Sequence, residues 1–195
     1  MLWCVDTSAW IDAVRLYNPA SPLFDRLWGF LEQEVLAGRV ISPKAVHDEL
    51  REKTLGDSQQ FAAFVKRVKG SQFAEETPEL QGRFAVIAVI VNEYPDLTKK
   101  GKPFAKSDAD AWVIGLAQER GAVIVAQEDP KPGARVPYQI PDVGRAVGLT
   151  TIRLDEFINT LQGLPAFVSL GGQTVEPPSS SSTHVSSPGK GGKPE

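Results

Sequence analysis

The fold of this chain is decided by the stretch Trp3-Cys4-Val5-Asp6-Thr7-Ser8-Ala9-Trp10. A short apolar run stops at Asp6, two hydroxyl residues follow, and apolar side chains then recur at helical spacing. This pattern predicts a buried strand that leads into a helix and carries a carboxylate at the turn. Ligands of parallel α/β proteins bind at the carboxyl ends of strands, so Asp6 is a candidate for chemistry. The competing interpretation is that Asp6, Thr7 or Ser8 caps the helix.

The composition is that of one well-cored globular domain with some length left over. The chain has 195 residues, of which 42% are hydrophobic and 23% are charged, and these fractions are ordinary for a globular protein. A formal net charge of −3 argues against a basic field over the whole molecule that would capture nucleic acid non-specifically. A local basic patch stays compatible with this charge.

Cysteine and histidine are too scarce for several common kinds of site. The single cysteine, Cys4, excludes an intramolecular disulfide, and the two histidines leave little material for a Cys/His zinc site or a Ser-His-Asp triad. A bound metal would therefore need oxygen ligands. The longest apolar run, residues 84–91, is far shorter than the roughly 20 residues of a membrane helix. Asp6 also interrupts the first apolar run too early for a signal peptide, so we expect a soluble cytoplasmic protein.

Short strands and helices alternate along most of the chain. Strands are predicted at 2–5, 40–42, 122–125 and 150–152, and helices at 8–16, 22–35, 44–53, 58–69, 78–91, 107–117, 142–147 and 154–161. This alternation predicts an α/β fold with a mainly parallel sheet that is covered on both faces. We expect Leu23 in the core stripe of the second helix and Asp155 as the cap of the last one. Residues 1–165 form the predicted domain, and residues 166–195 are rich in Pro, Ser and Gly and form a disordered tail.

Four acids occupy comparable places relative to the predicted strands. Asp6 and Glu128 follow strands, Glu49 lies in the helix after the strand 40–42, and Asp110 lies near the start of the helix before the strand 122–125. A parallel sheet brings strand ends to one edge, so these four acids can converge on one cleft. Crowded carboxylates repel one another and need cations. Mg²⁺ or Mn²⁺ suits such an oxygen site, and two such ions stabilise the displacement of a phosphodiester.

Each acid also has a purely structural interpretation. Glu49 precedes Lys53 by four residues, which is the spacing of an exposed helical ion pair. Asp110 follows Ser107 at the spacing of a capping box. Glu128 stands beside Asp129-Pro130, a sequence that favours a turn.

A basic loop precedes the Asp110 helix. Its lysines are Lys99, Lys100, Lys102 and Lys106. Beside an acidic centre these side chains would hold RNA phosphates. The alternative for each lysine is a solvated loop position.

The ordered set of acidic segments resembles the four motifs of PIN-domain nucleases. The segments are 5–8 (Val-Asp-Thr-Ser), 43–50 with Glu49, 108–117 with Asp108-Ala-Asp110, and 123–128 ending in Glu128; an Ile-Pro-Asp segment at 140–142 also matches one bacterial and archaeal branch. The resemblance implies a Rossmann-like three-layer α/β/α sandwich and Mg²⁺- or Mn²⁺-dependent cleavage of RNA. Many family members are toxins of toxin–antitoxin pairs, often dimeric, and are inhibited by a small partner protein.

The resemblance also assigns roles to residues. Asp6, Glu49 and Asp110 match the three common acids of the family, with Thr7 or Ser8 at the accompanying hydroxyl position. The fourth acid falls on Glu128 or Asp129. The chain departs from the family pattern at Ala126, where Thr or Ser is common, and at Glu128, where Asp is common.

Asp108 is a second candidate ligand in the third motif. It lies about 200° around the helix from Asp110, so the two cannot face one ion equally well. Asp110 fits the motif better. With Asp6 assigned to metal ligation, we expect helix capping to pass to Thr7 or Ser8, and we expect Cys4 to pack beneath the site.

The sequence therefore predicts a metal-dependent endoribonuclease that acts as the toxin of a toxin–antitoxin pair. One alternative is a degenerate domain that binds RNA or a protein without cutting. The other is a phosphatase of the haloacid dehalogenase type. That class expects a second Asp two residues after Asp6, where this chain has Ser8.

Overall fold

The computed structural model describes residues 1–53, 58–93, 109–129 and 139–163. Its centre is a single sheet with the strand order β3-β2-β1-β4-β5. All neighbouring strands pair in parallel, which confirms the predicted α/β fold class. The strands are β1 (Trp3–Val5), β2 (Val40–Pro43), β3 (Phe73–Ala74), β4 (Val123–Val125) and β5 (Thr151–Ile152). The predicted tail lies outside the described residues.

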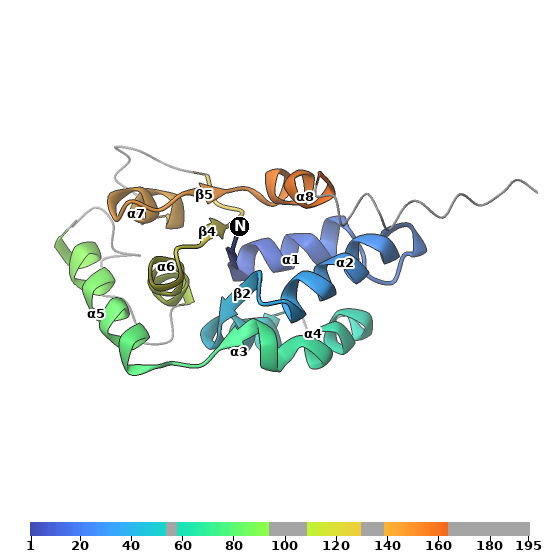
Figure 1. Ribbon diagram of the computed structural model, residues 1–195, viewed down its shortest axis with the longest axis horizontal. Helices are drawn as coiled ribbons and strands as arrows, with labels where there is room; N and C mark the ends of the chain where they lie inside the picture. The colour runs from blue at the N-terminus through green and yellow to red at the C-terminus, as the bar shows by residue number, and fades with distance from the viewer. Residues whose placement is uncertain (54–57, 94–108, 130–138, 164–195) are drawn as a thin grey trace, which may run out of the picture.

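Helices cover the sheet on both sides (Figure 1). In this view α5, α6 and α7 lie to the left of the strands, and α1, α2, α4 and α8 lie to the right. The helices are α1 (Thr7–Leu16), α2 (Asp25–Leu36), α3 (Lys44–Lys53), α4 (Gln59–Gln72), α5 (Pro78–Glu93), α6 (Ala109–Arg120), α7 (Ile140–Ala146) and α8 (Leu154–Gln162). This arrangement is the three-layer sandwich that the sequence predicts. None of the helices in the described ranges has the length and apolar character needed to cross a membrane.

Three local predictions differ from the structure. The strand β3 was not predicted, because two residues are too few to give a periodic signal. Leu23 is 86% exposed, because residues Pro22–Phe24 form a separate 3₁₀ turn before α2 and so leave the apolar stripe of that helix. The cap of α8 is Arg153 rather than Asp155, which lies in the first helical turn.

The carboxyl end of β1 is fixed by a buried hydroxyl. Trp10 Nε1 on α1 donates to Ser42 Oγ at 3.1 Å, and Ser42 Oγ donates to the carbonyl oxygen of Val5 at 2.6 Å. Ser42 is fully buried, so these bonds are shielded from competing water. They hold α1, β1 and β2 together immediately beneath Asp6.

The buried helix α6 approaches α5 closely at Gly115. A Cβ atom at this position would lie 3.4 Å from both Leu80 Cδ1 and Arg83 Cβ. The rings of Phe84 on α5 and Trp112 on α6 stack with centroids 4.4 Å apart. Gly115 thus lets the two helices meet, and their packing positions the start of α6, where Asp110 lies.

Candidate active site

The candidate site lies where the chain order of the sheet reverses direction. From β1 the chain builds β2 and β3 on one side and later β4 and β5 on the other, so β1 and β4 flank the point where α/β proteins commonly bind ligands. Asp6 directly follows β1, and its backbone N–H donates to the carbonyl oxygen of Val125 at 2.9 Å. Glu128 lies three residues after β4. This switch point therefore carries two of the predicted acids.

A pocket of about 170 Å³, here called the acid pocket, opens at this edge of the sheet. The described residues that line it are Asp6, Thr7, Ser8, Ile11, Glu49, Lys53, Asp110 and Glu128. The four acids that lead the sequence prediction thus share one cavity, although they come from four different segments. Both candidate hydroxyl residues, Thr7 and Ser8, line it as well.

Asp6 is the most deeply buried of the four acids, with 3% of its surface exposed. Its Oδ2 accepts hydrogen bonds from Ser8 N at 2.9 Å and from Ser8 Oγ at 2.6 Å. Asp6 is therefore the N-cap of α1, and the prediction that Thr7 or Ser8 would replace it as the cap was wrong. Its second oxygen, Oδ1, has no hydrogen-bond partner within the described ranges. One carboxylate both caps the helix and presents a buried oxygen to the site.

The environment of Asp6 disfavours its charged form. Burial, followed by the charge of Asp110, raises the pKa of Asp6 to about 7, whereas hydrogen bonds from Ser8 and Thr7 act in the opposite direction. A carboxylate crowded in this way is stabilised by a nearby cation. Burial and the charge of Asp6 also raise the pKa of the Cys4 thiol. Cys4 is fully buried and packs beneath the site in its neutral form, as expected.

Glu49 lines the acid pocket and also forms the predicted helical ion pair. It lines the acid pocket, and its Oε2 also accepts a hydrogen bond from Lys53 Nζ at 2.8 Å. The Glu49 side chain is 25% exposed and that of Lys53 is 54% exposed. The helical ion pair therefore forms at the mouth of the site.

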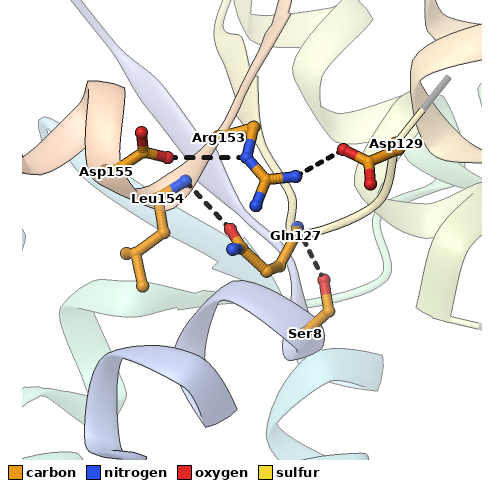
Figure 2. A network of polar contacts seen from close by, with 6 residues as sticks. All are labelled: Ser8, Gln127, Asp129, Arg153, Leu154 and Asp155. Carbon is orange, nitrogen blue, oxygen red and sulfur yellow. Dashed lines mark hydrogen bonds and ion pairs between the residues drawn. The ribbon is translucent and has the colours of Figure 1, made fainter. Parts of the chain in front are cut away.

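Glu128 and Asp129 point to different surroundings. Glu128 lines the acid pocket, and its Oε2 accepts from Ile140 N, at the start of α7, at 2.8 Å. Asp129 is not among the described residues that line the pocket, its side chain is 75% exposed, and it pairs with Arg153 (Figure 2). The structure thus brings Glu128, and not Asp129, to the other three acids.

A polar network joins the floor of the site to α8 (Figure 2). Gln127 N donates to Ser8 Oγ at 3.0 Å, and Gln127 Oε1 accepts from Leu154 N at 3.2 Å. Ser8 Oγ therefore connects the Asp6 carboxylate with the end of β4. Sequence reasoning missed Gln127 because a lone glutamine after a strand gives no local signal, and it treated Lys53 only as a surface partner of Glu49.

The candidate metal ligands of the acid pocket are of the chemical type that a hard divalent cation prefers. All are oxygens, and Asp6 Oδ1 and Thr7 Oγ1 are buried without a hydrogen-bond partner among the described residues. In the described segments, no three His, Cys, Asp or Glu side chains are arranged so that they could hold one metal ion together. Two of the acids accept hydrogen bonds within the protein, Glu49 from Lys53 Nζ and Glu128 from Ile140 N.

Five predicted site residues fall outside the described ranges. They are Lys99, Lys100, Lys102, Lys106 and Asp108. The roles predicted for them, in RNA binding and as an alternative ligand, stay predictions.

One protein family covers most of the chain. The family described as "Domain of unknown function (DUF4411)" matches residues 3–163, which include every residue that lines the acid pocket. The chain belongs to this family. None of the curated proteins matches it.

Two solved structures are similar to the chain. One is DNA-bound VapBC from Salmonella typhimurium, with 16% identity, a TM-score of 0.48, and coverage of 79% of this chain and 99% of that one. The other is VapBC2 from Rickettsia felis bound to a DNA fragment from their promoter, with 14% identity, a TM-score of 0.47, and coverage of 78% and 98% respectively.

Proposed function

We propose that this protein is a Mg²⁺- or Mn²⁺-dependent endoribonuclease that hydrolyses RNA phosphodiester bonds. The proposal rests on one observation, the acid pocket at the switch point of the sheet, which Asp6, Glu49, Asp110 and Glu128 line together. The sequence resemblance to PIN-domain nucleases singles out Asp6, Glu49 and Asp110 and puts the fourth acid at Glu128 or Asp129. A pocket lined by four carboxyl groups has little use as a neutral ligand site, whereas it suits the cations of phosphoryl chemistry. One of its oxygens, Asp6 Oδ1, is buried without a hydrogen-bond partner among the described residues.

In the proposed reaction the four acids have different roles. Asp6 and Asp110 would hold the cation, and Glu49 and Glu128 would complete its surroundings from α3 and from the segment after β4. A bound Mg²⁺ or Mn²⁺ would supply charge neutralisation for the phosphate and a lower pKa for a water molecule. Ser8 orients the Asp6 carboxylate through two hydrogen bonds, so it acts as a positioning residue.

The test is cleavage of single-stranded RNA by the purified full-length chain. Activity should require Mg²⁺ or Mn²⁺ and disappear with EDTA, and Asp6→Asn and Asp110→Asn should each lower the rate by at least about 100-fold. Asp129→Asn serves as the control, because it removes an acid from the same edge of the sheet but outside the acid pocket. Equal rates for the wild type and the Asp6 variant would overturn the proposal.

We further propose, from the family resemblance, that the protein is the toxin of a toxin–antitoxin pair, with a small protein inhibitor and a homodimeric state. Induced expression in a bacterial host should arrest growth, and Asp6→Asn should relieve the arrest. Co-expression of the proposed small inhibitor protein should relieve it too. Growth arrest that persists with Asp6→Asn would contradict a toxin role based on RNA cleavage.

A non-catalytic, RNA- or protein-binding domain is the second candidate function. The observation that favours it is the fully buried Ala126, which stands where the PIN resemblance expects a hydroxyl residue near the second metal. Calorimetry with Mn²⁺ separates the two functions. Tight RNA binding without Mn²⁺ uptake would favour this second function, whereas Mn²⁺ uptake that Asp6→Asn abolishes would favour the nuclease.

A further inference from the structure

Among the described residues that line the acid pocket, Lys53 is the only one with a basic side chain. It is the last residue of α3, and its Nζ lies 2.8 Å from Glu49 Oε2. Its side chain is 54% exposed, so it can change rotamer without disturbing the core. Lys53 is thus a mobile positive charge at the mouth of an anionic site.

The pocket also contains a second carboxyl group, that of Asp6, which is more deeply buried than Glu49. Asp6 is 3% exposed, and its Oδ1 has no hydrogen-bond partner in the described part of the chain. A buried, unpartnered carboxylate oxygen is costly, so it marks a place for a ligand. The Glu49–Lys53 pair, by contrast, is a partly exposed pair at i,i+4 spacing, and such pairs exchange partners at little cost.

We propose that Lys53 is an exchangeable counter-ion of the acid pocket: it neutralises Glu49 until a divalent cation binds, and its ammonium group then moves to an oxygen of the RNA phosphate. The first step concerns metal binding alone. The second step rests on the proposed ribonuclease function. A lysine has the chemistry for both, because it is a compact charge on a flexible stem with three donors.

The first step predicts that Lys53 weakens metal binding. An incoming divalent cation must displace the ammonium group from Glu49 and is repelled by it at close range. Removing the charge should therefore tighten binding, which is opposite to the effect expected of a lysine that merely stabilises the fold around the site.

The metal test is calorimetry with Mn²⁺ alone on the full-length chain at low salt. Lys53→Met should bind Mn²⁺ roughly tenfold more tightly than the wild type, and Lys53→Arg should stay near the wild type because it keeps the charge. Lys44→Met is the matched control: Lys44 lies on the same helix, is 48% exposed, pairs with Glu75 at 3.5 Å and does not line the acid pocket. Unchanged or weaker Mn²⁺ binding by Lys53→Met would overturn the proposal that Lys53 is a counter-ion of the acid pocket.

The phosphate test is fluorescence anisotropy with a 2′-O-methyl RNA oligonucleotide, which resists cleavage, in the presence of Ca²⁺. Lys53→Met should bind this RNA several-fold more weakly, even though it binds the metal more tightly. Equal RNA affinity for Lys53→Met and the wild type would overturn the phosphate step.

The two proposals fail in different ways. If the wild type does not cleave RNA but Lys53→Met binds Mn²⁺ more tightly, the proposed function is wrong and the proposed counter-ion role of Lys53 is supported. If the wild type cleaves RNA and Lys53→Met leaves Mn²⁺ affinity unchanged, the counter-ion is wrong and the nuclease stands. Thermal melting of each variant shows that the fold is intact.

Discussion

Replacing Asp6 by asparagine should make the metal-free protein more stable at alkaline pH. The pKa of Asp6 rises from its ordinary value of 3.8 to about 7 in the folded protein, so the folded state holds a proton that the unfolded state has already released between these pH values. Stability is therefore lost as the pH rises through this window. Asparagine cannot ionise, so the variant escapes this loss.

The size of the effect follows from the shift. A pKa that rises from 3.8 to about 7 corresponds to about 4 kcal/mol between pH values below 4 and above 7, because a tenfold change in an equilibrium constant is worth roughly 1.4 kcal/mol. Roughly 3 kcal/mol of this falls between pH 5 and pH 8. The introduced asparagine amide keeps an oxygen to accept from Ser8, while its buried NH₂ group costs about 1–3 kcal/mol at every pH. This cost is the same at both pH values, so it cancels when the stability difference between variant and wild type at pH 5 is subtracted from that at pH 8.

The assay is urea unfolding of both proteins in EDTA at pH 5 and pH 8. The free energy of unfolding of Asp6→Asn minus that of the wild type should rise by roughly 3 kcal/mol from pH 5 to pH 8. Asp129→Asn is the control, because Asp129 is exposed, and its difference from the wild type should not change between the two pH values by a comparable amount. A difference for Asp6→Asn that is independent of pH would refute the reasoning about burial and Asp110.

Three further predictions test other parts of the structure. Glu128→Gln should lower the rate of RNA cleavage by about 100-fold, whereas Asp129→Asn should leave it within a few-fold, because Glu128 is among the described residues that line the acid pocket and Asp129 is not. Initial rates at saturating Mn²⁺ test this prediction, and equal losses for the two variants would contradict it. Gly115→Val should lower the free energy of unfolding by about 1–3 kcal/mol, because even a Cβ atom added at residue 115 would lie 3.4 Å from two side chains of α5. Urea unfolding measures this, with Gly115→Ala as the milder substitution for comparison. A valine variant as stable as the wild type would show that the two helices separate easily. Ser8→Ala should raise the pKa of Asp6 further, because it removes the hydrogen bond from Ser8 Oγ to the carboxylate and keeps the bond from the backbone N–H. The pH profile of stability in EDTA should move to higher pH, and an unmoved profile would assign little weight to the Oγ bond.

The sequence predicted helices correctly at several segments with a periodic apolar pattern. The helix at 44–53 coincides with α3, because Val46 and Leu50 mark its buried side and Pro43 marks its start. The helix through residues 84–91 is confirmed by α5. Leu23 shows where this reasoning fails, since an apolar residue in phase with a helix is still exposed when the helix starts later than its pattern.

The four leading acids were predicted as a set because each stands at a fixed place relative to a strand end. Their contacts were not predictable in the same way. Asp6 turned out to be both cap and pocket residue, because Oδ2 accepts the two hydrogen bonds from Ser8 and Oδ1 has no partner among the described residues. The choice between Glu128 and Asp129 as the fourth acid depends on the backbone after β4. It directs the Glu128 side chain to Ile140 N and the Asp129 side chain to Arg153.

What the sequence determined by itself is the alternation of strands and helices and the acids at the strand ends, since both depend on neighbours a few residues away. The tertiary structure decided what those acids meet. The parallel register of β1 and β4 sets Val5 opposite Val125 and so brings Ser8 within 3.0 Å of Gln127, 119 residues further along the chain. The same packing buries Asp6 beside Asp110, raises its pKa, and turns Lys53 toward the acid pocket. Such effects depend on through-space distance and on exclusion of water, which only the assembled sheet and its helices establish.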